Sequence, residues 1–240
     1  MPSDRLGFRP QFWPTVIAVP AFLTLLGLGS WQVVRLAEKE AVNAFRAERA
    51  AAPPTDLVGT PADLTALEFR RVRVRGQFDH DRELYIYGRS QRGNDGYYIM
   101  TPLRREGATP VLINRGWVPR DRKEPARRAE GQAAGTVDVI GYLRHDARRG
   151  WLMPDNDVAG NHWFWFDLPA MSRKAGLAET ATFYLEADTT PNPGNFPVGG
   201  QTQVHLPSNH LQYAITWYAL AAAFAVIYVL WHRRRPLETP

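Results

Sequence analysis

The residue with the clearest chemical potential is His210, which begins an apolar segment close to the end of the chain. Tyr213 and Trp217 follow it at successive spacings of three and four residues, so the three side chains share one face of a helix. An imidazole among aromatic and small residues can act as the axial ligand of a haem held between helices. The alternative is an ordinary cluster at the membrane surface, because His, Tyr and Trp rings settle at the headgroup level.

A second group of side chains that could bind a ligand lies at an apolar segment near the start of the chain. Trp31, Arg35 and Lys39 are each four residues apart and therefore share a helical face. Cations at this position suit the carboxylates of an amphiphilic cofactor or the phosphates of membrane lipid. The same residues can also be plain anchors whose long side chains reach the membrane surface.

The other histidines form no pattern typical of a metal site. His80, His145, His162 and His205 do not stand at the spacing of paired metal ligands, although His205 precedes His210 by five residues and stays open as a second axial ligand. The sequence carries no motif of a serine hydrolase, a phosphate-binding loop, a dinucleotide-binding fold or a metalloprotease. We therefore expect a protein that is not an enzyme.

The amino-acid composition excludes further classes of binding site and partner. The 240 residues include no cysteine, which excludes disulfides and thiolate-bound metals. The formal charge of +5 comes from basic residues that are scattered or gathered beside the apolar segments, with no nucleic-acid motif among them. We expect no nucleic-acid partner.

The elements that must position these residues are two apolar segments, Phe12–Val34 and Leu211–Trp231. Each has about the 20 residues that a helix needs to cross a bilayer. The first is longer than the core of a signal peptide and no cleavage pattern follows it cleanly, so we expect it to be retained. The short basic tails predict that both termini are cytoplasmic and that the long middle segment is periplasmic, in a bacterial inner membrane. The predicted boundaries are cytoplasmic tails at 1–11 and 232–240, transmembrane helices at 12–34 and 210–231, and a periplasmic domain at 35–209 with a helical extension at 36–50.

The middle segment has the pattern of short strands. Val72 and Val74 alternate with arginines, which is the period of a strand with one solvated face, and Gly93–Gly96 is a strong turn signal. Asp167 and Gly176 mark the start and end of one short helix. The fold class expected is a membrane α+β protein, with two terminal transmembrane helices flanking a mainly antiparallel β domain, a barrel or curved sheet with small helices. The predicted strands are 69–78, 83–87, 96–103, 109–117, 136–143 and 183–186, and 119–135 is expected to be a loop or short helix.

Four sequence strings occur together, in one order, across most of the chain. They are GSWQVVRLAEK at 29–39, GRSQRGNDGYYIMTPL at 88–103, NRGWVP at 114–119 and NHLQYAITWYALA at 209–221. With the two-span layout, they resemble the Surfeit locus protein 1 family, which assembles haem–copper cytochrome c oxidase, and the chain is identified as a bacterial member. Gly116, within the NRGWVP string, is expected where the backbone leaves no room for a Cβ atom.

The resemblance implies that the protein receives haem a from haem a synthase and holds it before insertion into oxidase subunit I. Family bacterial members are linked to haem a binding through the histidine that corresponds to His210, and Trp217 matches the tryptophan of the same motif. The haem would bind transiently, with His210 as an axial ligand of its iron. From charge and position, Arg35, Lys39 and Arg115 are candidates to pair the haem propionates. The expected partners are subunit I, haem a synthase and membrane lipid.

Two interpretations of this role stay open. One is a haem a carrier that depends on His210. The other is a scaffold that steadies an oxidase assembly intermediate without binding haem.

Overall fold

The computed structural model describes residues 7–8, 10–90, 92–145, 149–177 and 182–234, and the chain divides into two compact units. Both ends of the chain, Met1–Phe45 and His205–Pro240, make up the first unit, and Arg46–Val204 make up the second. The predicted tails at 1–11 and 232–240 lie largely outside the described residues.

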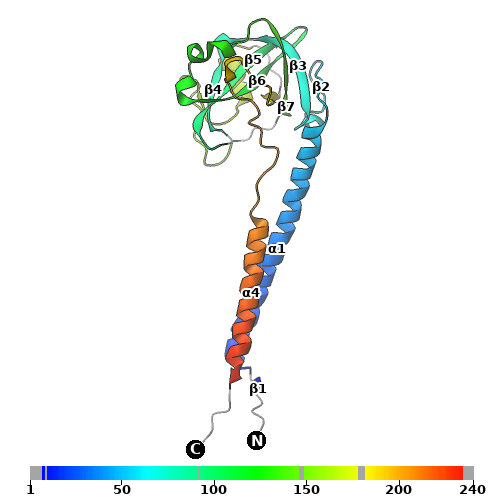
Figure 1. Ribbon diagram of the computed structural model, residues 1–240, viewed down its shortest axis with the longest axis vertical. Helices are drawn as coiled ribbons and strands as arrows, with labels where there is room; N and C mark the ends of the chain where they lie inside the picture. Colours follow the sequence, from blue (N-terminus) through cyan, green and yellow to red (C-terminus); the bar gives the residue numbers. More distant parts are fainter. Residues whose placement is uncertain (1–6, 9, 91, 146–148, 178–181, 235–240) are drawn as a thin grey trace, which may run out of the picture. The chain divides into compact units, whose positions relative to one another are not determined.

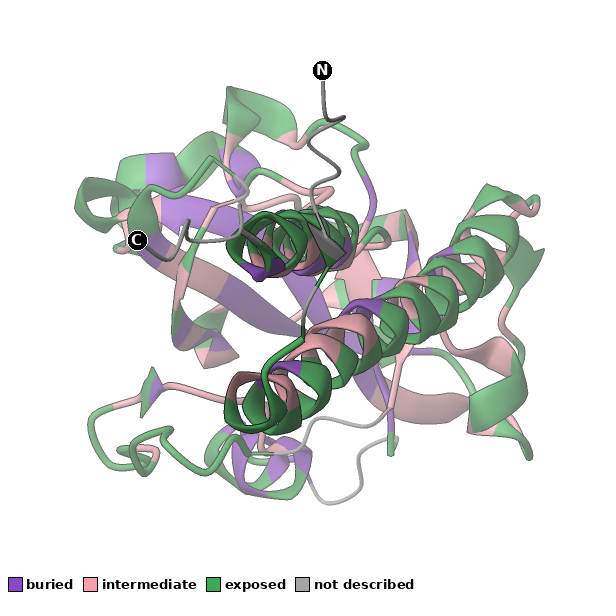
Figure 2. Cartoon of the chain, turned by 90° about the horizontal axis from the view of Figure 1, so that it is seen from below, coloured by how far each residue is buried: buried purple, intermediate pink, exposed green. Residues whose placement is uncertain are grey.

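The first unit is a pair of helices that lie side by side, α1 (Phe12–Ala51), which belongs to this unit as far as Phe45, and α4 (His210–His232) (Figure 1). Helix α1 ends at Ala51 because the two prolines that follow cannot continue it. Both helices are long and apolar enough to cross a membrane, and only 11% of each apolar window is buried. Figure 2 shows their mainly exposed surfaces. Side chains that avoid water yet stay uncovered by protein are compatible with a two-pass membrane protein.

Small residues bring the two helices into contact. Ala18 and Gly29 of α1 are buried, as are Ala214 and Ala221 of α4. A Cβ atom on Gly29 would lie 2.9 Å from the ring of Tyr218, whose hydroxyl is 3.0 Å from Ser30 Oγ. Further along, Thr15 Oγ1 lies 2.6 Å from the hydroxyl of Tyr228. Beyond the ends of the helices, strand β1 (Gly7–Phe8) pairs with β10 (Arg233–Arg234) in antiparallel fashion.

The second unit is a closed five-stranded barrel. Its strand order is β3-β7-β9-β6-β5, and β5 pairs back onto β3 through Gln77 with Arg104 and Phe78 with Leu103. The β6–β9 pair is parallel, whereas the other barrel pairs are antiparallel. The barrel confirms the expected fold class. Its strands are β3 (Arg71–Phe78), β5 (Asp95–Arg105), β6 (Ala108–Pro119), β7 (Thr136–Arg144) and β9 (Tyr184–Ala187).

Shorter elements extend this barrel. Asp167 caps the helix at residues 168–174 by accepting a hydrogen bond from Ala170 N at 3.0 Å, and Gly176 follows with φ +63°, as the sequence predicted. The segment expected to be a loop or short helix contains two 3₁₀ turns. The short elements are β2 (Thr55–Asp56), β4 (Leu84–Arg89), β8 (His162–Trp163), α2 (Leu64–Leu67), α3 (Leu168–Lys174), η1 (His80–Arg82), η2 (Arg120–Arg122), η3 (Pro125–Gly131) and η4 (Pro193–Asn195).

Two apolar cores hold the second unit together. Val72 and Val74 of β3 lie in the first core, with side chains from all five barrel strands or their margins. The second core packs β4 and β5 against Trp163 and α3. Strand β6 contributes to both, since Ile113 belongs to the first and Leu112 to the second. Because both of its faces are covered, β6 is buried along most of its length and does not alternate as β3 does.

Candidate functional site

The candidate site in the first unit is centred on His210, in the first turn of α4. Its Nδ1 atom lies 2.7 Å from Oε1 of Gln32, a buried residue of α1. The amide oxygen can only accept a hydrogen bond, so Nδ1 carries the proton and donates it. In a neutral imidazole with this hydrogen bond, the lone pair is on Nε2, which is the form that binds a metal. The contact with Gln32 is therefore compatible with the predicted ligand role of His210.

The aromatic residues predicted around His210 occur on both helices. Tyr213 and Trp31 are each about half exposed, at 53% and 51%, and Trp217 is partly buried. Exposed rings on a membrane helix can contact lipid or the flat face of a bound macrocycle. The exposure of Trp31 and Tyr213 is compatible with the predicted role of these rings beside His210.

The two cations predicted on α1 have different surroundings. Arg35 donates from Nη1 to Oε2 of Glu38 at 2.7 Å, and its guanidinium carbon lies 5.8 Å from the centre of the Trp31 ring. Both members of the Arg35–Glu38 pair are about half exposed, and an ion pair of this kind is weak and exchangeable. Lys39 is partly buried one turn further along. Arg35 can therefore turn to another carboxylate at little cost.

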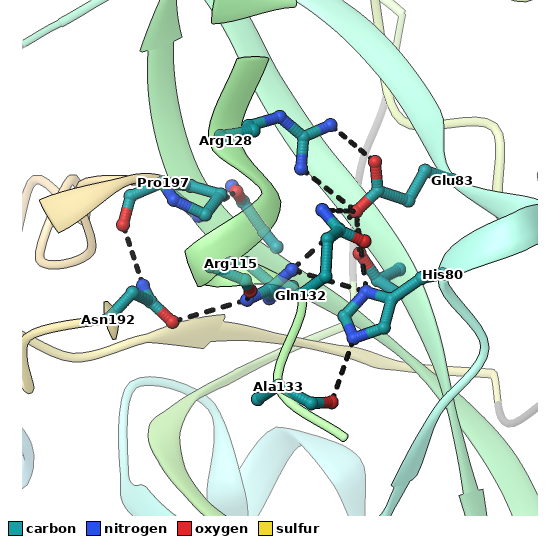
Figure 3. Close-up of polar contacts among 12 residues, drawn as sticks. His80, Glu83, Arg115, Arg128, Gln132, Ala133, Asn192 and Pro197 are labelled. Atoms are coloured by element: carbon teal, nitrogen blue, oxygen red, sulfur yellow. Dashed lines mark hydrogen bonds and ion pairs between the residues drawn. The ribbon is translucent and has the colours of Figure 1, made fainter. Parts of the chain in front are cut away.

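Arg115 belongs to the second unit, whereas the other predicted site residues belong to the helix pair, and its side chain is 2% exposed. It donates to the carbonyl of Gly131 and, at 3.4 Å, to Oδ1 of Asn192, while Nη1 lies 3.5 Å from Oε1 of Glu83 (Figure 3). Its charge is already engaged, so this placement gives no support to the predicted pairing of Arg115 with a propionate.

Glu83 is the centre of a buried polar network at this place in the barrel. Arg128 donates from Nη1 to Oε1 of Glu83 at 3.1 Å and from Nη2 to Oε2, and both side chains are 1% exposed. Gln132 and Thr101 each donate to Oε1 at 3.4 Å (Figure 3). The bidentate pair links η3 to the start of β4, and such geometry is the strong form of the Arg–carboxylate contact.

The electrostatics of the network favour the charged forms. Burial by itself would raise the pKa of Glu83, but His80, Arg128 and Arg115 together lower it from 4.5 to about 2. Burial lowers the pKa of Arg115 to about 10, and Glu83 opposes that change. Both groups are therefore ionised at neutral pH. A carboxylate with so low a pKa is a poor proton donor or acceptor, so the network acts in structure more than in acid–base chemistry.

Gly116, next to Arg115, is confirmed as a position that leaves no room for a Cβ atom. Its φ of +120° is in the region that favours glycine, and a Cβ atom would overlap the carbonyl of Val198. The neighbouring Trp117 exchanges backbone hydrogen bonds of 2.9 and 2.8 Å with Val198. The close approach seats the segment after η4 against β6.

Sequence reasoning gave no role to Gln32, Glu83 or Arg128. Gln32 is 178 residues from His210, and Arg128 is 45 residues from Glu83, so no local spacing could pair them. Among the described residues, no group of three or more His, Asp or Glu side chains is placed to hold a metal ion. A single imidazole suits a metal that brings its own equatorial ligands, as haem iron does.

Comparison with known proteins places the chain in a family. The SURF1 family model matches residues 19–222. The chain is 37% identical to Surfeit locus protein 1 of Rattus norvegicus, over 94% of this chain and 76% of that protein. It is 37% identical to Surfeit locus protein 1 of Homo sapiens, over 91% and 76%, and 33% identical to the SURF1-like protein of Drosophila melanogaster, over 97% and 80%. The resemblance drawn from the four sequence strings is confirmed, and the chain belongs to the SURF1 family.

Proposed function

We propose that this protein is a membrane-anchored assembly factor that binds haem a through His210 and assists its insertion into subunit I of cytochrome c oxidase. Membership of the SURF1 family implies a role in the assembly of cytochrome c oxidase. The observation that supports haem binding is the 2.7 Å contact between His210 Nδ1 and Gln32 Oε1, which leaves Nε2 free to bind iron.

A single protein ligand suits a cargo that must be handed on. Haem iron bound by one histidine keeps its other axial site open to water or to a histidine of the acceptor, so transfer can begin before the first bond breaks. Two histidine ligands would hold the cargo more tightly and suit electron transfer better. His205, which is exposed, stays open as a second ligand.

The other predicted residues take supporting parts in this proposal. The half-exposed rings of Trp31 and Tyr213, with Trp217, form apolar surface for the macrocycle and its isoprenoid tail. Arg35 exchanges Glu38 for a propionate, and Lys39 lies one turn further along the same face. Pairing with propionates at the membrane surface neutralises both acids where water is scarce.

The proposed setting is a bacterial inner membrane with both termini in the cytoplasm and the β domain in the periplasm. Basic residues flank the ends of the two apolar helices that are nearest the chain termini, and they support this orientation. The proposed partners are haem a synthase, as the donor of haem, and subunit I, as the acceptor. Surrounding lipid completes the site.

A scaffold that does not bind haem is the second candidate function, and one feature of the β domain favours it. Trp151 and Leu152 are 91% and 76% exposed on a loop. Arg149 holds this loop by donating to the carbonyl of Met153 at 3.0 and 2.7 Å and by pairing with Asp155 at 2.6 Å. A loop that presents large apolar side chains to solvent is typical of a protein-binding surface.

The visible spectrum of the purified full chain, produced together with the enzymes of haem a synthesis, tests the proposal. We expect a haem a spectrum in the wild type and in His162→Ala, which removes an exposed histidine from the β domain. His210→Ala should lose the spectrum while keeping the wild-type circular dichroism. A colourless wild type in the presence of haem a would favour the scaffold, and haem retained by His210→Ala would move the ligand elsewhere.

A further inference from the structure

Helix α1 has one buried face with a regular register. Its buried residues are Ala18, Gly29, Gln32 and Asn43. The separations are 11, 3 and 11 residues, and 11 residues make almost three whole turns at 3.6 residues per turn. All four therefore share one face. Two of them are small residues that admit α4, and the other two are amides.

Both amides bind the segment that leads into α4. Asn43 Nδ2 donates to the carbonyl of Leu206 at 3.0 Å, and Leu206 N donates back to Asn43 Oδ1 at 3.0 Å. The side chain thus pairs with the backbone of Leu206 as a neighbouring strand would. Three turns away, Gln32 accepts from His210 Nδ1 at 2.7 Å. Asn43 and Gln32 hold two points that are only four residues apart in sequence.

The segment between these two points is short. Gln32 and Asn43 are 11 residues apart on α1, which corresponds to about 16 Å along the axis. Four residues span at most about 14 Å when fully extended. Asn209 has φ −101° and ψ 9°, so the connection turns as it enters α4, and the side chains of Gln32, Asn43 and His210 cover the remaining distance. So short a connection links the position of His210 to that of Leu206, which Asn43 holds.

We propose that Gln32 and Asn43 are positioning residues that prepare His210 as a metal ligand before any cargo arrives. Gln32 selects the tautomer in which Nδ1 carries the proton and Nε2 the lone pair. Asn43 fixes the position of the imidazole along α1 by holding Leu206, four residues before His210. The use of this arrangement for haem rests on the proposed function, but the tautomer and the position do not.

The chemical reason lies in the competition between two forms of neutral imidazole. Without an acceptor at Nδ1, the ring can place its proton on Nε2, where it would block metal binding. A hydrogen bond from Nδ1 removes that competition and makes Nε2 more basic. Loss of such a partner typically lowers metal affinity by roughly 10 to 100-fold.

Nitrogen NMR of the full chain in lipid nanodiscs, with ¹⁵N-labelled histidine, tests the tautomer without any haem. We expect the His210 signals of the wild type to report a protonated Nδ1 and a bare Nε2. Gln32→Leu should shift the proton towards Nε2, whereas Gln32→Glu keeps an oxygen acceptor and should preserve the wild-type form. Gln212→Leu, which removes an exposed amide of α4, is the matched control and should change nothing. An unchanged tautomer in Gln32→Leu would overturn the proposal.

Titration of the same variants with haem a gives the second readout. We expect Gln32→Leu to weaken binding by roughly 10 to 100-fold and Gln32→Glu to retain it. Asn43→Leu should also weaken haem binding, because Leu206 and hence His210 are no longer held in place along α1. His210 should still donate from Nδ1 in this variant, because Gln32 remains as the acceptor. Equal affinity in wild type and Gln32→Leu would overturn the positioning role. A wild type that shows the expected tautomer but binds no haem would support the positioning of His210 and refute the proposed function.

Discussion

At the scale of single residues, the structure separates two kinds of buried polar contact. Gln32 and His210 form a hydrogen bond between the two apolar helices, whereas Glu83 carries a full charge into the β domain. Removing one member of a buried ion pair leaves the other without compensation, and this usually costs more than the pair contributes. Removing the charge of Glu83 should cost more than removing Gln32, because both Arg115 and Arg128 pair with Glu83.

We predict that Glu83→Gln destabilises the β domain by about 3–5 kcal/mol, because two buried guanidinium groups lose their counter-charge. Urea unfolding of the full chain in detergent, followed by near-UV circular dichroism, measures the change. Asp56→Asn is the matched control, since it breaks an exposed pair with Arg73 and should cost less than about 1 kcal/mol. Similar losses in the two variants would contradict the buried network.

The same carboxylate predicts a dependence of stability on acid. Its pKa is about 2 in the folded chain and 4.5 ordinarily, so the unfolded chain binds the proton more readily. The stability that Glu83 contributes is complete above pH 4.5 and is lost as the pH falls through 2. The gap between the two pKa values corresponds to about 3 kcal/mol.

Urea unfolding of the wild type at several pH values through this window measures the loss. Glu83→Gln should lack this component of the acid dependence, because it has no carboxyl group to titrate there. An identical slope in the wild type and the variant would assign the acid dependence to other carboxylates.

At the scale of elements, the fit of β6 against the segment around Val198 depends on an absent side chain. Gly116 combines φ +120° with a close approach to the Val198 carbonyl, which is backbone and cannot swing aside. Gly135 also has a positive φ, +76°, but nothing lies within 4 Å of the place where its Cβ would be. Gly135 therefore needs glycine only for its backbone conformation, whereas Gly116 needs it both for its conformation and for lack of space.

We predict that Gly116→Ala destabilises the β domain by at least about 2 kcal/mol, from backbone strain together with displacement of Val198. Gly135→Ala should cost only about 1 kcal/mol, from its left-handed conformation alone. Thermal unfolding of both full-length variants measures the difference. Equal transition temperatures would mean that β6 can shift to accept the extra carbon.

At the scale of the whole molecule, two apolar helices at the ends of one chain predict a definite topology. The sequence has no cysteine, so a single introduced cysteine reports its side of the membrane without background. In intact bacterial cells, we expect a membrane-impermeant maleimide to label Arg92→Cys, in an exposed turn of the β domain. Thr239→Cys, in the basic tail, should react only after the inner membrane is opened. The reverse pattern would invert the proposed orientation.

The sequence by itself determined the two long helices, the barrel strands and α3, because their signals are local. The apolar segments predicted α1 and α4, and consecutive prolines marked where α1 ends. Alternation at Val72 and Val74 predicted β3, while Asp167 and Gly176 bounded α3. The four sequence strings were also enough to indicate the SURF1 family, because each is a continuous run of residues.

Only the tertiary structure decided what those elements bring together. Barrel closure needs β3 to meet β5, the tautomer of His210 needs Gln32 from the other helix, and the charge of Arg115 is engaged by Glu83. Strand β6 lost its alternation because two cores cover it. Each of these contacts joins residues far apart in the chain, and the preference of a residue for its near neighbours carries no information about a distant partner.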